Sequence, residues 1–331
     1  MSLSMSVDTQ MIKVLVTGGA GFIGSNLCQR LLDLGYHVTC LDDLSTGFKK
    51  NIEAFQHNNR FQFVHGDITD LNTCMEAVNG CRFVFHQAAL GSVPRSINNP
   101  LATNAVNITG FLNMLEASKQ AKVRRFIFAA SSSTYGDSAV LPKVENQIGR
   151  PLSPYAVTKL VNELYADVFY RTYGMEYIGL RYFNVFGKNQ DPDGAYAAVI
   201  PRFVKQLMRI ESPIINGDGS FSRDFTFIEN VVNANILALN TTNEKALNQV
   251  YNVACGEATT LKDLAEKIKQ YLSEKNKAIA GVPIVYGEQR TGDIPHSLAS
   301  IDKIESLLGY QPSVLIDSGL QQAIDWYWEN I

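Results

Sequence analysis

The sequence predicts an α/β fold in which a parallel sheet carries helices on both faces. Short apolar and β-branched runs alternate with longer segments of helical periodicity through the first half of the chain. A glycine-rich segment lies between the first of these runs and the first helical segment. Both features are typical of a doubly wound parallel sheet. The length of 331 residues also leaves space for a second domain, since domains average roughly 150 residues.

Six strands of the sheet can be placed from the apolar runs. They are predicted at 12–17, 37–41, 61–65, 82–86, 125–130 and 177–181, with helices near 27–34, 71–78, 101–119 and 155–173. After residue 181 the alternation weakens, and prolines and turn-forming segments become frequent. We therefore predict two interleaved domains after a flexible leader at 1–10. The sheet domain covers 11–182 and 226–255, and a smaller α+β domain covers 183–225 and 256–331.

The composition is that of an ordinary globular protein and excludes several classes of partner. The 29 Lys and Arg against 32 Asp and Glu give a formal charge of −3, so we expect no nucleic-acid or membrane binding through a basic face. No apolar run is long enough for a membrane span. The five cysteines lack C-x-x-C spacing, which disfavours disulfides and zinc and favours a reducing cytoplasm. No set of side chains has the spacing of metal ligands.

The glycine-rich segment TGGAGFIG (17–24) has the spacing G-x-x-G-x-x-G, a variant of the dinucleotide-binding fingerprint. Gly18 would permit a tight turn, Gly21 would let a pyrophosphate approach the helix N-terminus, and Gly24 would let helix and strand pack closely. Asp42 ends the second strand about 20 residues further on, where a carboxylate accepts from ribose hydroxyls and repels a 2′-phosphate. The pattern therefore predicts a Rossmann domain that binds NAD rather than NADP.

The spacing and placement of three polar residues predict a site for proton transfer beside this cofactor. Tyr155 and Lys159, in SPYAVTK (153–159), are one helical turn apart and so share a helix face. A lysine ammonium beside a phenol stabilises the phenolate and lowers the pKa of the tyrosine, as a general base requires. Ser131, in AASSSTYG (129–136), closes the preceding strand at the carboxyl edge of the sheet, where open α/β folds bind ligands.

The glycine motif, Asp42 and the set of Ser131, Tyr155 and Lys159 together resemble the extended short-chain dehydrogenase/reductase superfamily, from Met11 to the C-terminus. Within this superfamily, the resemblance to the UDP-galactose 4-epimerase family implies an enzyme that keeps NAD bound throughout turnover. Tyr155 would take the proton of a sugar 4-hydroxyl with Ser131 bridging. Lys159 would bond the nicotinamide ribose and hold Tyr155 ionised.

Four further segments are similar to bacterial UDP-N-acetylhexosamine 4-epimerases of the UDP-galactose 4-epimerase family. They are HQAALGSVPRS (86–96), RYFNVFG (181–187), DPDGAYAAVIP (191–201) and NGDGSFSRDF (216–225). In that family a 4-keto sugar forms, turns about its diphosphate linkage and regains its hydrogen on the opposite face. The resemblance therefore implies inversion at C4 of a UDP-sugar without net oxidation.

The resemblance also implies which residues hold the two ligands. The cofactor set is Gly18, Gly21, Phe22, Ile23, Gly24, Asp42, Asp43, Ser45, Thr46, Gly47, Asp67, Ile68, Gln87, Ala88, Ala89, Asn104, Tyr155, Lys159 and Tyr182. The substrate set is Ser92, Ser131, Ser132, Tyr155, Asn184, Ala198, Val199, Ile215, Arg223, Arg290, Asp293 and Ser297. Within the second set, the guanidinium groups of Arg223 and Arg290 suit the diphosphate of a UDP-sugar.

Ser297, in GDIPHS (292–297), bears on the choice of sugar. In epimerases of the family that are confined to UDP-glucose and UDP-galactose, the matching position holds a bulky tyrosine, whereas enzymes that accept a 2-acetamido group have a small residue there. A serine leaves room for the acetyl group, which favours UDP-N-acetylglucosamine and UDP-N-acetylgalactosamine as substrates. Epimerisation of UDP-glucose, or of UDP-N-acetylhexosaminuronic acids, stays open as an alternative.

Other activities of the superfamily fit the sequence less well. Sugar dehydratases and uronate decarboxylases place acidic residues directly after the catalytic serine or threonine, whereas Ser132 and Ser133 stand there in this chain. A protein that only senses NAD usually lacks the tyrosine or the lysine, and both are present here.

The two long predicted helices, 101–119 and 155–173, predict a homodimer. They carry more apolar side chains than one sheet face needs, namely Phe111, Leu112, Leu115, Leu160, Leu164, Val168 and Phe169. In the superfamily the equivalent helix pair forms a four-helix bundle between two subunits, so we expect a twofold dimer. Burial of the same side chains against the sheet is the competing interpretation.

Overall fold

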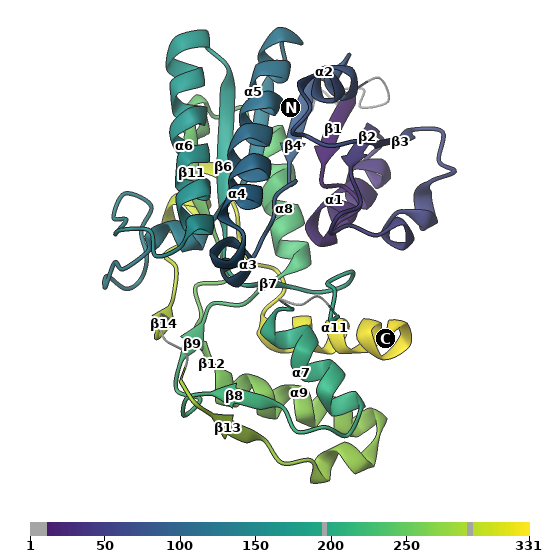
Figure 1. The fold of residues 1–331 in the computed structure, drawn as a ribbon, viewed down its shortest axis with the longest axis vertical. Helices are drawn as coiled ribbons and strands as arrows, with labels where there is room; N and C mark the ends of the chain where they lie inside the picture. The colour runs from purple at the N-terminus through teal and green to yellow at the C-terminus, as the bar shows by residue number, and fades with distance from the viewer. Residues whose placement is uncertain (1–11, 194–196, 290–293) are drawn as a thin grey trace, which may run out of the picture.

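The computed structural model describes residues 12–193, 197–289 and 294–331, and at its centre is a seven-stranded parallel sheet (Figure 1). The strand order is β11-β6-β5-β4-β1-β2-β3. The bounds are β1 (Lys13–Thr17), β2 (His37–Asp42), β3 (Phe61–His65), β4 (Phe83–His86), β5 (Arg125–Ser131), β6 (Glu176–Tyr182) and β11 (Gln249–Val253). The predicted doubly wound α/β fold is therefore confirmed, and all six predicted strands belong to this sheet.

Helices cover both faces of the sheet because its strands are apolar on both sides. One apolar cluster contains side chains of α1 (Phe22–Asp33) and α8 (Ile228–Asn240). The cluster on the opposite face contains side chains of α2 (Leu71–Val78), α5 (Phe111–Gln120) and α6 (Pro154–Tyr173). All seven strands run in the same direction, so their carboxyl ends meet at one edge of the sheet.

The predicted helix at 101–119 is not uniform. It consists of α4 (Pro100–Asn104), a π-helical segment (Ala105–Gly110) and α5. The π-helical segment places the Asn107 amide so that Oδ1 accepts from Leu90 N at 2.8 Å and Nδ2 donates to Thr158 Oγ1 at 3.1 Å. This side chain therefore joins the loop after β4 to α6, which a regular periodicity in the sequence could not reveal.

Local signals explain why α6 begins where it does. Ser153 caps its N-terminus by accepting from Ala156 N at 3.2 Å, and Pro154 occupies the first turn, where a missing N–H costs nothing. The helix ends at Gly174, whose φ of 71° is left-handed. Tyr155 is thereby fixed in the first turn of the helix, next to the carboxyl edge of the sheet.

The smaller unit lies beyond the carboxyl edge of the sheet (Figure 1). It comprises α7 (Val199–Met208), α9 (Leu261–Lys275), α11 (Ile316–Asn330), the pair β8 (Ile214–Asn216) and β13 (Val285–Gly287), and a three-stranded sheet of β12 (Thr259–Thr260), β9 (Ser222–Arg223) and β14 (His296–Ser297). One helix inside the predicted second domain, α10 (Asp302–Leu308), packs against β11 of the central sheet instead. The exact domain boundaries stay a prediction.

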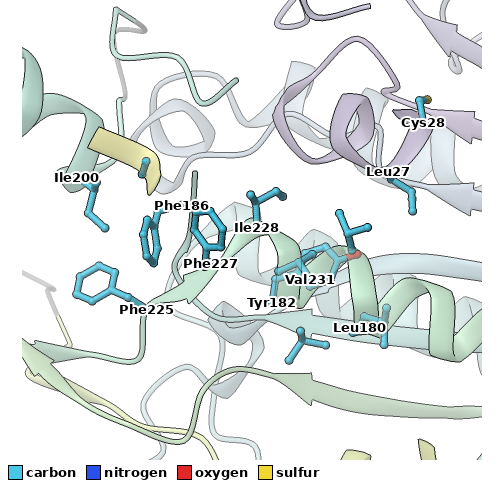
Figure 2. Packing of buried hydrophobic residues seen from close by; sticks show 14 of the residues in the cluster. Leu27, Cys28, Leu180, Tyr182, Phe186, Ile200, Phe225, Phe227, Ile228 and Val231 are labelled. Atoms are coloured by element: carbon cyan, nitrogen blue, oxygen red, sulfur yellow. The ribbon is translucent and has the colours of Figure 1, made fainter. Parts of the chain in front are cut away.

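The two units share one continuous core. The chain crosses between them at β7 (Val185–Phe186) and β10 (Thr226–Phe227), which pair in parallel. Figure 2 shows the rings of Phe186, Phe225 and Phe227 gathered there, and the centroid of Phe186 lies 5.5 Å from that of Phe227. Ile200 of α7 belongs to the same cluster as Leu27 of α1. Since side chains of both units interlock, the second unit is held firmly over the sheet edge.

None of the helices in the described part of the chain combines the length and the apolar character that a bilayer span requires. The five cysteines are all buried and unpaired.

Candidate active site

A cavity of about 410 Å³ lies at the carboxyl edge of the sheet, and most of the predicted cofactor residues line it. Fourteen of them do so: Gly18, Gly21, Phe22, Ile23, Gly24, Asp42, Asp43, Ser45, Thr46, Asp67, Ile68, Gln87, Ala88 and Ala89. They come from the segments that follow β1, β2, β3 and β4. The position agrees with the rule that doubly wound sheets bind ligands at the carboxyl ends of their strands.

The backbone of the glycine turn packs closely against neighbouring backbone, and its Gly21 side lines the cavity. Gly18 has φ 65°, and a Cβ there would lie 2.7 Å from Ala88 N. A Cβ on Gly24 would lie 2.0 Å from the carbonyl oxygen of Gly18. Gly21 precedes α1 with no side chain capping the helix, so the first N–H groups of α1 face the cavity without a side-chain acceptor. Such N–H groups and the helix dipole attract a phosphate.

Asp42 lies at the end of β2 with only 7% of its surface exposed. Its Oδ2 accepts from Ala20 N at 2.9 Å and its Oδ1 accepts from Leu44 N at 2.8 Å. Burial raises the pKa of this carboxyl, and the bonds from Leu44 and Ala20 oppose the rise. Each oxygen keeps a further lone pair for a ribose hydroxyl. The Asp42 carboxylate is therefore oriented by the backbone before any ligand arrives.

Sequence reasoning missed several residues that line the same cavity. They are Leu41, Gly66, Leu90, Gly91, Arg95, Val106, Gln190, Asp191 and Ala197. Ala198, predicted to contact the substrate, lines it as well. Gln190, Asp191, Ala197 and Ala198 follow the central strands β1 to β6 in sequence, so the cavity is closed by parts of the chain that are far apart in sequence.

The predicted catalytic residues meet at the end of β5 and the start of α6. Ser131 is the last residue of β5, and its Oγ accepts hydrogen bonds from Ser133 N at 3.1 Å and from Ser133 Oγ at 2.9 Å. The Nζ of Lys159 lies 6.0 Å from the ring centroid of Tyr155 and donates to Ala129 O at 2.8 Å. A hydrogen bond also joins Tyr155 to Ser131.

The expected lowering of the tyrosine pKa is wrong for the chain alone. Burial raises the pKa of Tyr155, and the hydrogen bond with Ser131 opposes this only in part. The reason is that the Lys159 ammonium bonds to a backbone carbonyl of β5 rather than to the phenol. Burial also lowers the pKa of Lys159 to about 8, while the charge of Glu163 pulls it upward. In the chain alone the Lys159 ammonium therefore does not offset the effect of burial on the pKa of the Tyr155 phenol.

Glu163 belongs to a buried ion pair beneath these residues. Nε of Arg181 donates to Glu163 Oε1 at 2.9 Å, and Nη2 donates to Oε2 at 2.7 Å. The two side chains are 4% and 8% exposed. Arg181 lies on β6 and Glu163 lies one turn after Lys159 on α6. The bidentate pair therefore fixes the rotation of α6 relative to the sheet.

Tyr182 does not line the cavity but supports a residue that does. Its hydroxyl donates to Gln87 Oε1 at 3.1 Å and accepts from Asn235 Nδ2 at 2.9 Å. Burial raises the pKa of Tyr182 to about 12, so this hydroxyl stays protonated and keeps donating. The Gln87 amide is thereby oriented at the cavity wall.

The structure places Arg223 beside Ser297. The two residues are register partners in the parallel pair β9 and β14, and Asp224 N donates to Ser297 O at 2.8 Å. Nη1 of Arg223 donates to Ser222 O at 2.9 Å and to Pro295 O at 3.1 Å. Asn184 Nδ2 donates to Asp224 O at 3.0 Å. Three predicted substrate residues therefore form one connected group in the second unit.

Asp224 is the centre of this group. Its side chain is fully buried and accepts from Cys255 N at 2.8 Å and Gly256 N at 3.0 Å. Burial raises the pKa of Asp224 to about 6 against the effect of these hydrogen bonds. Sequence reasoning did not identify Asp224, because a carboxylate that bonds distant backbone groups leaves no spacing signal.

The remaining predicted site residues have other positions. The side chain of Ile215 is 1% exposed and belongs to the core, so only its backbone can face a ligand. Within the described residues, the cavity lining does not include the predicted catalytic residues Ser131, Tyr155 and Lys159. Nor does it include Gly47, Asn104, Ser92, Ser132 and Val199, although Gly47 packs against Asp42 and Ser92 follows a lining residue. Asn104 is exposed on α4. Arg290 and Asp293 lie outside the described residues.

The chain matches the model of the NAD dependent epimerase/dehydratase family over residues 14–254. It belongs to this family. It is 38% identical to a putative UDP-glucose 4-epimerase of Methanocaldococcus jannaschii, over 96% of this chain and 99% of that protein.

Two solved structures extend the likeness to the whole fold of this family member. One is a UDP-N-acetylglucosamine 4-epimerase from Methanobrevibacter ruminantium in complex with UDP-N-acetylmuramic acid, with 36% identity, a TM-score of 0.89, and coverage of 97% of this chain and 100% of that chain. The other is a UDP-glucose 4-epimerase from Thermus thermophilus in complex with NAD, with 31% identity, a TM-score of 0.84, and the same coverage.

The cavity fits the NAD that this epimerase family uses. The glycine turn offers backbone N–H groups to a diphosphate, and Asp42 offers a carboxylate to a ribose. Cβ atoms at Gly18 and Gly24 would collide with the backbone, so the close turn depends on glycine there. The lining of the cavity at the sheet edge therefore fits NAD, the cofactor that the sequence predicts and the family uses.

The Lys159 charge is costly to bury, which leads to a stability prediction. The pKa of Lys159 is about 8 in the folded chain against 10.5 for the free side chain, so the folded state disfavours its charge. The cost is full below about pH 8 and fades as the pH rises to about 10.5. We expect Lys159→Met to stabilise the NAD-free chain at pH 7 by on the order of 2 kcal/mol, measured by urea unfolding.

The same measurement at pH 10 should show a smaller gain. Lys277→Met, at an exposed lysine, is the control and should change stability little at either pH. A Lys159→Met chain that is no more stable than the parent at pH 7 would contradict the account.

Proposed function

We propose that this NAD-dependent epimerase inverts C4 of UDP-sugars and that its preferred pair is UDP-N-acetylglucosamine and UDP-N-acetylgalactosamine. The observation that carries the sugar preference is the small, half-buried Ser297 beside Arg223. The Arg223 guanidinium suits the diphosphate of a UDP-sugar. The small Ser297 side chain beside it leaves room for a 2-acetamido group on the sugar.

In this reaction the side chains of the protein transfer one proton, that of the sugar 4-hydroxyl. Tyr155 removes the proton of the sugar 4-hydroxyl through Ser131, whose Oγ is already oriented by Ser133. Bound NAD supplies an acceptor and later a donor for the hydrogen of C4. After the keto sugar has turned, Tyr155 returns the proton to the oxygen at C4. Atoms and electrons balance, since the hydrogen and the proton that leave both come back.

Lys159 keeps the base in its reactive state. Its ammonium lies one turn from Tyr155, and the cofactor ribose would take the hydrogen bond now made to Ala129 O. Burial in this cleft excludes water, which strengthens the attraction between the ammonium and the forming phenolate. Glu163 helps Lys159 to stay protonated because its charge raises the pKa of that lysine.

Two alternatives share the site and differ in the sugar. UDP-glucose lacks the acetyl group and enters a pocket sized for a larger substituent, so it remains a possible second substrate. A uronic acid brings a carboxylate that calls for a cationic or amide partner near C6. Dehydration is disfavoured because Ser132 and Ser133 follow Ser131 and offer no carboxyl group for the elimination.

Replacement of the proposed base tests the activity. Tyr155→Phe should lower the rate of UDP-N-acetylglucosamine epimerisation by about 10²- to 10⁴-fold, since general base catalysis contributes roughly that much. Binding of NAD and UDP should change little because the ring remains. The rate is measured by NMR of UDP-N-acetylgalactosamine formation, with Tyr170→Phe on the same helix as the control. Parent protein that converts no UDP-sugar would refute the proposed function.

The sugar preference has its own test. Ser297→Tyr should lower kcat/KM for UDP-N-acetylglucosamine at least about tenfold more than for UDP-glucose, because the ring fills the space of the acetyl group. Ser297→Ala keeps the space and should preserve both activities. Equal losses with both sugars in the tyrosine variant would place the discrimination elsewhere.

The dimer is also proposed rather than observed. Phe111, Leu115 and Phe169 are buried against the sheet, so the sequence-based assignment of these three to an interface was wrong. Leu164 and Val168 are 58% and 44% exposed on α6, and they continue an apolar face with Val157 on α6 and with Leu101 and Ile97 on the adjoining α4 and α3 (Val93–Asn98). This face supports a second copy packed on α6.

Light scattering tests the dimer. The parent should elute with the mass of two chains and Leu164→Glu with the mass of one, because a carboxylate at the centre of the face opposes burial. Tyr286→Glu, on the distant β13, should leave the mass unchanged. A parent that scatters as a single chain would remove the proposal. The cytoplasmic location stays a prediction from the cysteines.

A further inference from the structure

The charges around the NAD cavity are unbalanced. Four carboxylates line its described walls: Asp42, Asp43, Asp67 and Asp191. Arg95 is the one cationic side chain among the described lining residues. A dinucleotide brings a diphosphate with two further negative charges into this space. The helix N-terminus supplies only about half a positive charge, so a nearby cationic side chain would offset much of the remaining negative charge.

We propose that Arg95 is the cationic anchor of the cofactor diphosphate. Its guanidinium donates to the diphosphate oxygens that the backbone N–H groups of α1 leave unpaired. The planar fork of a guanidinium suits two oxygens of one phosphate or one oxygen of each. The inference depends on NAD binding by this family and not on which sugar is epimerised.

The backbone around Arg95 is unusually constrained. Ser92 has a φ of 142°, and a positive φ of this kind is energetically unfavourable for a residue other than glycine. Its side chain caps α3 by accepting from Arg95 N at 3.2 Å, and Pro94 stiffens the first turn. Strain of this kind persists only where surrounding structure enforces it. The strained cap fixes the direction of α3 and thereby the point from which the Arg95 side chain starts.

The loop that leads to α3 is tied to the glycine turn. Ala88 N donates to Thr17 Oγ1 at 3.2 Å, at the residue before Gly18. Leu90 is held from both sides by Asn107, through Leu90 N at 2.8 Å and Leu90 O at 3.2 Å. The short path from Gly18 to Arg95 is therefore rigid. Binding of an anion by Arg95 therefore does not have to bear the cost of ordering this loop.

The cofactor is the better assignment than the diphosphate of the sugar nucleotide. Arg95 shares its cavity with Gly18, Gly21 and the first turn of α1, which form the dinucleotide turn. Arg223, the predicted partner of the substrate diphosphate, is bonded within β9 and β14 of the second unit. The chain thus supplies a separate arginine from each unit.

Ligands that differ in the diphosphate test the proposal on the full chain after NAD has been removed. Arg95→Gln should weaken ADP-ribose binding about 10- to 100-fold, the usual effect of losing a charge-assisted hydrogen bond. Adenosine, which lacks phosphate, should bind both chains with the same Kd. Arg95→Lys should fall between, because it keeps the charge and loses the fork. Calorimetry gives each Kd, and Arg124→Gln is the control at an exposed arginine.

Three results would overturn the proposal. Adenosine binding reports whether the site is still folded in the variant. An equal loss of adenosine and ADP-ribose affinity would therefore assign Arg95 a structural role. Unchanged ADP-ribose affinity together with weaker UDP binding to the NAD-loaded protein would assign Arg95 to the substrate diphosphate. Unchanged affinity for both would exclude Arg95 from binding either diphosphate. None of these outcomes depends on epimerase activity, so failure of the proposed function is recognised separately.

Discussion

The buried pair of Arg181 and Glu163 is the interaction on which the catalytic geometry depends. It joins the middle of α6 to the carboxyl end of β6 through two hydrogen bonds of 2.9 and 2.7 Å. The helix cannot rotate without breaking a charged pair in the protein interior, which typically costs several kcal/mol. One turn earlier on the same face lies Lys159, and one turn before that lies Tyr155. The pair thus fixes the base and its ammonium against Ser131 while the Glu163 charge supports the charge of Lys159.

Much of the fold could be predicted because its signals are local. Each strand of the sheet is a continuous apolar run, as both faces are covered, and the glycine turn has a spacing that few other structures require. In a parallel sheet the carboxyl ends of all strands lie at one edge. Gly18, Asp42 and Gln87 each follow or end a strand, so they could be placed in one cavity although they are far apart in sequence. The seventh strand, β11, was not located as a strand because its five residues include polar Gln249 and Asn252 and follow a loop.

The rest depends on contacts that leave no pattern in the chain. The π-helical segment is recognised only when Asn107 is seen to bond Leu90 and Thr158. Tyr182 supports Gln87 from outside the cavity, and Asp224 joins segments of the second unit through backbone N–H groups. The direction of the Tyr155 pKa was mistaken because spacing shows that a lysine is near but not which acceptor its ammonium bonds. Pattern reasoning is thus strongest for secondary structure and weakest for the partners of buried polar groups.

In the proposed mechanism the cleft removes the C4 hydrogen of a UDP-sugar and returns the same hydrogen to the opposite face, shielded from water. Epimerisation of UDP-N-acetylglucosamine in D₂O, followed by proton NMR of the sugar ring, tests this most directly. We expect the UDP-N-acetylgalactosamine formed to carry protium at both C4 and C5, because neither hydrogen exchanges with solvent. Deuterium at C4 or at C5 would contradict it, since the hydrogen would then have passed through water or the reaction through a different carbon.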